Sequence, residues 1–369
     1  MAANEELIAL EAKHNLYIQR VAVGLGNDAK PYIAAMQQDI TNRINREVGK
    51  NLTANRRKKL LADINEITRT HLNEYNKELS TGNAAVGKYE ADWQSKTIGA
   101  MYPEAEAAVV TKAAVNVAAK TSLIKLGEGS YTSYNQMLRN YTNKNAQQIS
   151  AIVANGFVGG VSTREIAGQV LAETDNRIIK TQKEAMGIAR TGTNHYANTA
   201  RQVYFEEEPL VEYMQHISVL DSRTSRICSS RDGAIFKKEE RRYYPPLHYN
   251  CRSAVSPYIQ ADDDEDEIGY RPSNFRDADS GLLQPTQTNS KQIFYDEFAK
   301  LGNKKGGAAT QDAQLGPTLG KAFRKGIKDK SITPESFAAM TIDDKNLTPL
   351  TLTEMKDKDN ALGRILRGQ

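Results

Sequence analysis

Apolar residues recur every three or four positions through the first hundred residues of the chain. One set comprises Ile33, Met36, Ile40, Ile44 and Val48, and a second comprises Leu60, Ile64, Ile67, Leu72, Tyr75 and Leu79. This spacing places each set on one face of a helix. Thr53 is suited to cap the second helix, and the segment 80–83 (STGN) is suited to end it. Apolar stripes must be covered, so we expect these helices to pack on each other or on a partner.

The middle of the chain predicts further helices. The alanine-rich segment 104–120 favours a helix strongly, and a glycine-rich break follows at 126–129. Helical patterns then continue over 134–154, 162–173 and 177–208, with Ser162 and Glu165 spaced as in a capping box.

After Pro209 the pattern changes from helix to strand. Residues 211–219 (VEYMQHISV) alternate and favour β-structure, and Ala234–Phe236 forms a short second strand after the turn at Asp232 and Gly233. We therefore expect residues 211–258 to form a small β-containing knuckle on a helical core.

The last third of the chain is more polar. Residues 262–267 form an unbroken acidic run, which is typical of a solvated linker. Beyond a helical island at 292–301, scattered apolar positions predict short helices in an extended C-terminal arm that gains structure on a partner. The predicted fold is mainly α (α+β), elongated, with an N-terminal helical docking region at 1–125, a core at 130–258, a linker at 259–290 and the arm at 291–369.

Composition narrows the class of protein. The 369 residues suffice for two or three domains, and 39% hydrophobic with only 7% aromatic residues suits an elongated helical protein. A net charge of +4 does not by itself indicate nucleic acid; the basic cluster 56–59 is either a DNA contact or a solvated helix start. The chain lacks a membrane-spanning apolar run and the order of a signal peptide, and two cysteines suit a reducing cytosol.

Both cysteines lie close to a histidine in the knuckle. Cys228 is followed by the pair His248 and Cys251 in an H-x-x-C spacing. Thiolate and imidazole are the ligands that zinc prefers, so the segment predicts a zinc site with Asp232, Asp221 or water in the fourth position. A Cys228–Cys251 disulfide and two unrelated buried thiols are the alternatives.

Enzymatic interpretations find less support. A Cys–His nucleophile pair needs a third group to orient the base, and the sequence offers none that can be recognised. A metal-dependent nuclease built on His248 and Asn250 needs a further ligand aimed at a catalytic metal, and none is singled out. We therefore expect a protein that is not an enzyme and has no catalytic residues.

The knuckle resembles the signature of the tailed-phage head-morphogenesis family, the phage Mu F-like minor head proteins. The matching residues are Asp221, Arg223, Thr224, Cys228, Asp232, Gly233, Pro245, Pro246, His248, Asn250, Cys251 and Arg252. Ser225 and Ser253 stand where the family has cysteines, and Tyr249 replaces a proline. The segments 149–170, 188–204, 314–325 and 350–355 are similar to further parts of the family pattern.

This resemblance implies a structural minor head (minor capsid) protein of a tailed bacteriophage. Such a protein associates with the phage portal protein, lies in the capsid interior near the packaged DNA, and acts in capsid assembly and in DNA packaging or delivery. It would be assembled in the host cytoplasm, be present in multiple copies per virion, and have no membrane partner. The alternative is a metal-dependent nuclease or DNA-binding protein that acts on phage DNA.

Overall fold

A computed structural model describes residues 3–51, 53–106, 108–127, 129–156, 163–220, 223–240, 243–259, 273–276, 283–286, 296, 298–343 and 348–369. The protein is mainly α-helical with a few short strands, as predicted. In this described part of the chain, no helix has the length and apolarity needed to span a membrane.

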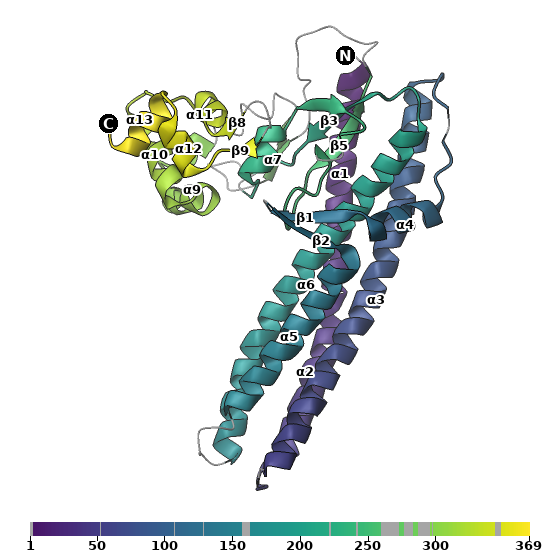
Figure 1. Ribbon diagram of the computed structural model, residues 1–369, viewed down its shortest axis with the longest axis vertical. Helices are drawn as coiled ribbons and strands as arrows, with labels where there is room; N and C mark the ends of the chain where they lie inside the picture. The colour runs from purple at the N-terminus through teal and green to yellow at the C-terminus, as the bar shows by residue number, and fades with distance from the viewer. Residues whose placement is uncertain are drawn as a thin grey trace.

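Five helices form an elongated bundle. They are α1 (Ala3–Asn27), α2 (Ala29–Asn45), α3 (Ala54–Met101), α5 (Tyr134–Gly156) and α6 (Thr163–Glu207). Figure 1 shows α3, α5 and α6 running side by side with α2 toward one end of the molecule, while α1 extends toward the other end. At 48 residues, α3 spans about 70 Å.

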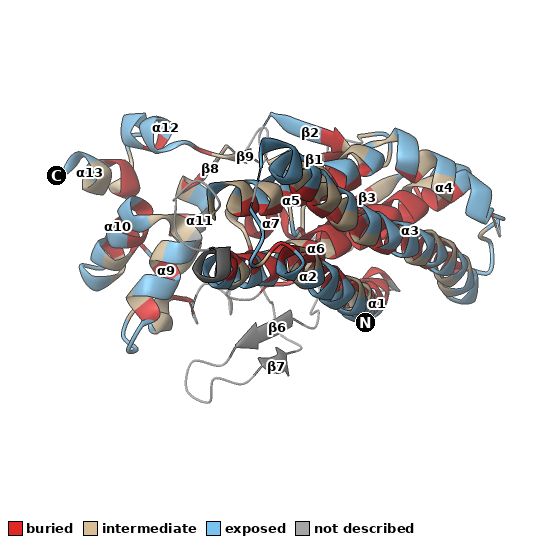
Figure 2. Cartoon of the chain, turned by 90° about the horizontal axis from the view of Figure 1, so that it is seen from below, coloured by how far each residue is buried: buried red, intermediate tan, exposed pale blue. Residues whose placement is uncertain are grey.

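The predicted apolar stripes form the core of this bundle. Ile33, Met36, Ile40 and Ile44 of α2 are buried, as are Leu60, Ile64, Leu72, Tyr75 and Leu79 of α3. They pack in one cluster with Tyr141 of α5 and Ile188 of α6, and Figure 2 shows the buried faces of the helices turned toward each other. The N-terminal helices therefore cover their stripes by packing within the chain, on residues from both sides of the expected boundary near 125–130.

The helix capped by Thr53 is longer than predicted. Thr53 caps α3 by accepting a hydrogen bond from Arg56 N, but α3 continues through 80–83 instead of ending there. A Cβ on Gly82 would meet the side chain of Leu25. Asn83 is buried and donates to Tyr134 Oη at 2.9 Å. Gly82 and Asn83 of the predicted stop signal thus serve close packing inside the bundle.

The next prediction was also wrong in its boundaries. Among the described residues of the segment 104–120, the helix is α4 (Lys112–Thr121), which Thr111 caps by accepting from Ala114 N. Pro103 follows the last residues of α3 and disfavours helix at Tyr102. A hairpin of β1 (Leu123–Gly127) and β2 (Ser130–Ser133) occupies the expected glycine-rich break.

The helices expected at 162–173 and 177–208 form the single helix α6. The expected gap, 174–176 (TDN), consists of residues with low helix propensity, but the helix continues through it and Thr174 is buried there. Residues 157–162, with the predicted capping serine, lie outside the described residues.

The knuckle is a three-stranded antiparallel sheet in the order β4–β3–β5. Its strands are β3 (Tyr213–Ile217), β4 (Ile235–Lys237) and β5 (Ala254–Tyr258), and the short helix α7 (Arg226–Arg231) connects β3 to β4. The first two strands confirm the prediction, whereas β5 was not predicted. Strand β5 packs on both α1 and α6, which attaches the knuckle to the bundle.

The C-terminal region contains the expected short helices, but they pack together instead of forming an extended arm. They are α9 (Gly307–Leu315), α10 (Pro317–Lys328), α11 (Pro334–Met340), α12 (Leu352–Asp357) and α13 (Ala361–Arg367), with a small pairing of β8 (Ile342–Asp343) and β9 (Thr348–Pro349). Their apolar residues gather around the buried Phe323. Because these apolar residues cover one another, the C-terminal region buries its apolar surface without extending onto a partner.

The C-terminal helices contact the knuckle through α7. Arg226 Nη2 donates to Leu350 O at 3.0 Å, and β9 packs on α7. In the sequence between the knuckle and the C-terminal helices, strands β6 (Ser273–Arg276) and β7 (Leu283–Thr286) pair with each other in antiparallel orientation. The acidic run 262–267 and half of the island 292–301 lie outside the described residues.

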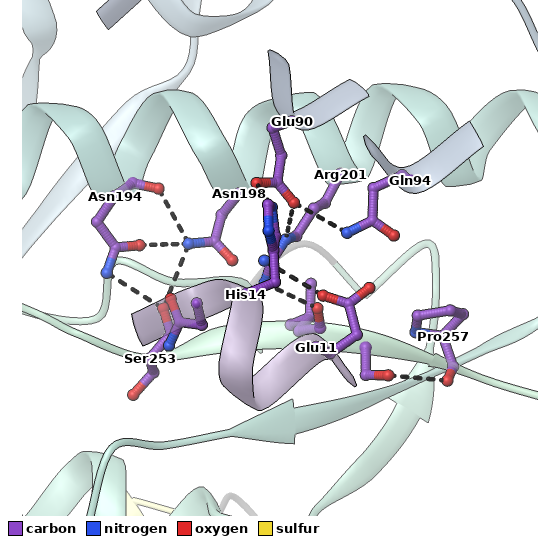
Figure 3. A network of polar contacts seen from close by, with 12 residues as sticks. Glu11, His14, Glu90, Gln94, Asn194, Asn198, Arg201, Ser253 and Pro257 are labelled. Carbon is purple, nitrogen blue, oxygen red and sulfur yellow. Dashed lines mark hydrogen bonds and ion pairs between the residues drawn. The ribbon is translucent and has the colours of Figure 1, made fainter. Parts of the chain in front are cut away.

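A buried ionic cluster joins α1, α3 and α6. Arg201 Nε of α6 lies 2.6 Å from Glu90 Oε1 of α3, and its Nη2 lies 3.2 Å from Glu11 Oε2 of α1. All three side chains are buried. His14 Nε2 contacts the second Glu90 oxygen at 2.8 Å, and the His14 ring stacks on Trp93 with centroids 3.7 Å apart. Figure 3 shows Glu11 and His14 reaching from α1 toward Glu90 and Arg201.

The two carboxylates of this cluster differ in their protonation. Burial raises the pKa of Glu11 to about 8, and the nearby Glu90 charge adds to this effect while Arg201 opposes it. Burial acts on Glu90 in the same direction, but Arg201 and His14 outweigh it and hold the pKa of Glu90 at about 2. At neutral pH the cluster therefore contains one ionised carboxylate beside Arg201 and one carboxyl group that retains its proton.

We predict that the stability of the protein falls as pH rises because Glu11 must lose this proton. The folded protein binds it more tightly than the unfolded chain, whose pKa is near 4.5, so the contribution is complete below pH 4.5 and lost as pH rises through about 8. Urea denaturation of Glu11→Gln should show a weaker decline over this range than wild type. Glu207→Gln, on the exposed end of α6, is the control and should keep the wild-type decline; equal slopes for all three proteins would contradict the assignment.

Candidate metal centre

The polar face of α6 holds the segment that carries Cys251. Asn194 Nδ2 donates to Cys251 O at 2.6 Å and to Ser253 O at 3.1 Å. One turn earlier, Thr191 Oγ1 accepts from Asn250 N at 3.0 Å. Figure 3 shows Asn194 pointing at Ser253 from α6. These buried hydrogen bonds fix the backbone on which one thiol is carried.

The three predicted ligands meet in the knuckle. Cys228 lies on α7, and His248 and Cys251 lie on the turn that precedes β5. Their donor atoms all lie within 4.8 Å of one another. Cys228 Sγ is 3.1 Å from His248 Nε2 and 3.7 Å from Cys251 Sγ. Both cysteines are buried against Leu247, whereas His248 is partly exposed.

The sulfur separation distinguishes the alternatives for the two thiols. A disulfide bond has a length of about 2.05 Å, so at 3.7 Å the two cysteines of this structure are free thiols and not a disulfide. Two thiolates bound at about 2.3 Å to a tetrahedral zinc ion would lie about 3.8 Å apart. The sulfur pair fits that geometry. The Cys228–His248 distance of 3.1 Å is shorter than the roughly 3.6 Å expected, so the imidazole would have to move outward slightly.

The protonation of the group also suits metal binding. Burial acts to raise the pKa of Cys251, but hydrogen bonds from Cys228 and His248 outweigh it and hold this pKa well below the ordinary thiol value. Cys228 donates to Cys251, and this bond and burial hold the pKa of Cys228 well above that value. Because the thiolate is the form that binds metals, one ligand is ready and the second must release its proton.

The imidazole is oriented by the backbone. His248 Nδ1 lies 2.8 Å from Tyr249 O, so this nitrogen carries the proton that it donates to the carbonyl. The other nitrogen, Nε2, faces the sulfur pair, and it donates to Cys251 while it carries a proton. Once that proton is released, the Nε2 lone pair points at the same position, which is the arrangement of a metal-ligating histidine with its outer partner.

A residue that sequence reasoning did not select lies next to the group. Ser225 Oγ lies 2.7 Å from His248 Nε2, and it also caps α7 by accepting from Cys228 N. Asp232, the predicted fourth ligand, is not part of the group; its Oδ1 instead accepts from Ser218 N at 2.7 Å. Asp221 lies outside the described residues. Ser225 could have been recognised because it stands where the resembled pattern has a cysteine.

Sequence reasoning also missed the α6 residues that support the site. Their common signal is a polar stripe at helical spacing, formed by Arg190, Asn194, Asn198 and Arg201. On an exposed helix such a stripe is ordinary, but here Asn194, Asn198 and Arg201 are buried against the knuckle or α1. His195, on another face, is buried with its Nε2 2.7 Å from Ala119 O, and burial lowers its pKa to about 4. His195 therefore belongs to the core, and its hydrogen bonds do not involve the three predicted ligands.

Comparison with known protein families gives a match over the middle of the chain. Residues 147–256 match the family described as Phage Mu protein F like protein. This confirms the resemblance over the segment from the end of α5 to β5, which includes Cys228, His248 and Cys251. Over these residues the chain is similar to that family, which supports a protein of phage head morphogenesis. The resemblance noted at 314–325 and 350–355 lies beyond the matched segment and stays a prediction. No curated protein and no solved structure gave a significant match.

We predict that Asn194→Ala lowers the free energy of unfolding by about 1–3 kcal/mol, because two buried carbonyls, those of Cys251 and Ser253, lose a donor. Asn140→Ala, at an exposed position of α5, should change it by less than about 0.5 kcal/mol. Urea denaturation of both variants measures the difference, and a similar small effect in both would argue against the role of Asn194 in attaching the knuckle.

Proposed function

We propose that this protein is a structural minor head protein of a tailed bacteriophage, which associates with the portal protein inside the capsid and acts in head assembly and in DNA packaging or delivery. The observation that carries this proposal is the family match over residues 147–256, which covers the knuckle and the helix that holds it. The elongated bundle with a knuckle and helical C-terminal region at one side suits a structural component.

We further propose that Cys228, His248 and Cys251 bind one zinc ion, with Ser225 or water completing the site. The sheet of the knuckle has strands of three to five residues, so it has little apolar surface with which to hold α7 in place. A metal ion between α7 and the turn before β5 would connect these segments, as structural zinc does in small domains.

The contacts of His248 favour this structural role over the nuclease alternative. Its Nε2 is directed at Cys228 and Ser225, and its Nδ1 is engaged by Tyr249 O. In the described part of the chain, no carboxylate joins the group. Metal-dependent hydrolysis needs an open coordination position reached by substrate, whereas both thiols here are buried.

We expect purified protein to contain about one zinc ion per chain, and Cys228→Ser to contain none, as measured by inductively coupled plasma mass spectrometry. Chelation should lower the melting temperature of wild type and leave that of Cys228→Ser unchanged, because only the wild type has metal to lose.

Ser225→Cys offers a matched gain-of-ligand control. A third thiol at this corner should raise zinc affinity. Because Ser225 also caps α7, the control is Ser230→Cys, which changes a buried serine of the same helix away from the group. The zinc proposal would be overturned if purified wild-type protein contained no metal and its melting temperature did not change on addition of chelator.

The head proposal is tested in assembled particles. Mass spectrometry of phage heads purified with their portal protein should detect this chain, and portal protein alone should retain it in co-purification. Heads assembled without the chain should yield fewer DNA-filled, infectious particles. Heads that never contain the chain, and that fill and infect normally without it, would contradict the proposed function.

A further inference from the structure

Three arginines from distant parts of the sequence gather at the junction of α6 and the knuckle. Arg190 lies on α6, Arg223 follows β3, and Arg252 directly follows Cys251. Both Arg223 and Arg252 act electrostatically on Arg190, and after burial they are the causes that lower its pKa. The hydrogen bond of Asn250 N to Thr191 Oγ1 shows independently that the turn carrying Arg252 lies against the Arg190 region of α6.

The backbone that presents Arg252 is held on both sides. Asn15 Nδ2 of α1 donates to Arg252 O at 2.9 Å, and Asn194 Nδ2 binds the carbonyls of the residues before and after it. Arg252 is therefore placed by the fold. Its side chain and that of Arg190 are partly buried, while Arg223 is exposed, so the group faces solvent.

Gathering three positive charges costs electrostatic free energy unless an anion compensates for it. Arg223 and Arg252 have further interactions of their own. Arg190 makes no hydrogen bond or ion pair within the described residues, and no carboxylate among them acts on it. A partly buried guanidinium that is placed beside two others and lacks an acidic partner is typical of a site for an external anion.

We propose that Arg190, Arg223 and Arg252 form a binding site for a phosphate group, beside the Cys/His centre. Guanidinium groups form paired hydrogen bonds with phosphate oxygens, and a phosphate can accept from several of them at once. With the proposed function as its basis, the phosphate belongs to the backbone of packaged DNA. Free phosphate or pyrophosphate is the other source of the same chemistry.

This site differs from the basic cluster at 56–59 that the sequence suggested. Arg56 and Arg57 are exposed at the start of α3, at the opposite end of the bundle from the knuckle in Figure 1. Their charges belong to consecutive residues of one helix, whereas the three arginines are brought together only by the fold.

The test compares variants that remove the same charge at different places. Arg190→Gln should weaken binding of fluorescein-labelled double-stranded DNA about tenfold in fluorescence anisotropy, since a charge-assisted contact to phosphate is lost. It should also reduce the slope of log affinity against log salt by about one. Arg20→Gln, at an exposed position of α1, should change affinity less than about twofold. Arg190→Lys keeps the charge without the fork and should lie between wild type and Arg190→Gln.

Two further measurements separate the sources of the anion. If DNA binding is equal in all variants but pyrophosphate raises the melting temperature of wild type and not of Arg190→Gln, the site is a phosphate site for a small ligand. Equal behaviour of Arg190→Gln and Arg20→Gln with both ligands would overturn the proposal. The proposal would also be overturned if polyglutamate bound as tightly as DNA and this binding depended on Arg190, because the site would then bind acidic polypeptide.

These binding assays use purified full-length protein, so their outcome is independent of head assembly. Incorporation of the wild-type chain into heads, together with equal binding of both DNA and pyrophosphate by all variants, would leave the proposed function in place and reject the phosphate site. Selective loss of binding in Arg190→Gln, with no incorporation of the wild-type chain into heads, would support the phosphate site and reject the proposed function.

Discussion

The buried ion pair between Arg201 and Glu90 holds together the part of the molecule on which the knuckle depends. It lies where α1, α3 and α6 meet, and Arg201 Nη1 also donates to Val255 O of β5 at 3.1 Å. Removing one partner of such a pair leaves a buried charge without compensation, which typically costs about 3–5 kcal/mol. The positions of α1 and β5 relative to the bundle are thus tied to one guanidinium group.

The same face of α6 continues this arrangement toward the candidate metal centre. Asn198 and Asn194 lie one and two turns before Arg201 and bind the backbone around Ser253. At the far side of the knuckle, Arg226 of α7 binds carbonyls of the C-terminal region. The Cys/His group therefore lies between a polar helix face and a separate helical cluster, and it joins the two segments, α7 and the turn before β5, that these contacts hold.

Prediction from the sequence succeeded where one local signal dominated. The stripes of α2 and α3, the two strands β3 and β4, and the trio of Cys228, His248 and Cys251 all follow from spacing between near neighbours. Prediction failed where residues that locally resemble a helix stop instead pack against another helix. Asn83 looked like part of a helix stop, but its side chain is satisfied by Tyr134 from another helix, so α3 could continue without exposing or orphaning a polar group.

The sequence by itself determined which helix faces are apolar and which residues carry ligand chemistry, because periodicity and side-chain type are properties of short segments. Only the tertiary structure decided that Ser225 rather than Asp232 lies next to the group, and that Arg190 lies beside Arg223 and Arg252. Those outcomes depend on how α6, α7 and β5 pack against one another. A shift of one helical turn in that packing would bring different polar side chains together while leaving every local pattern unchanged.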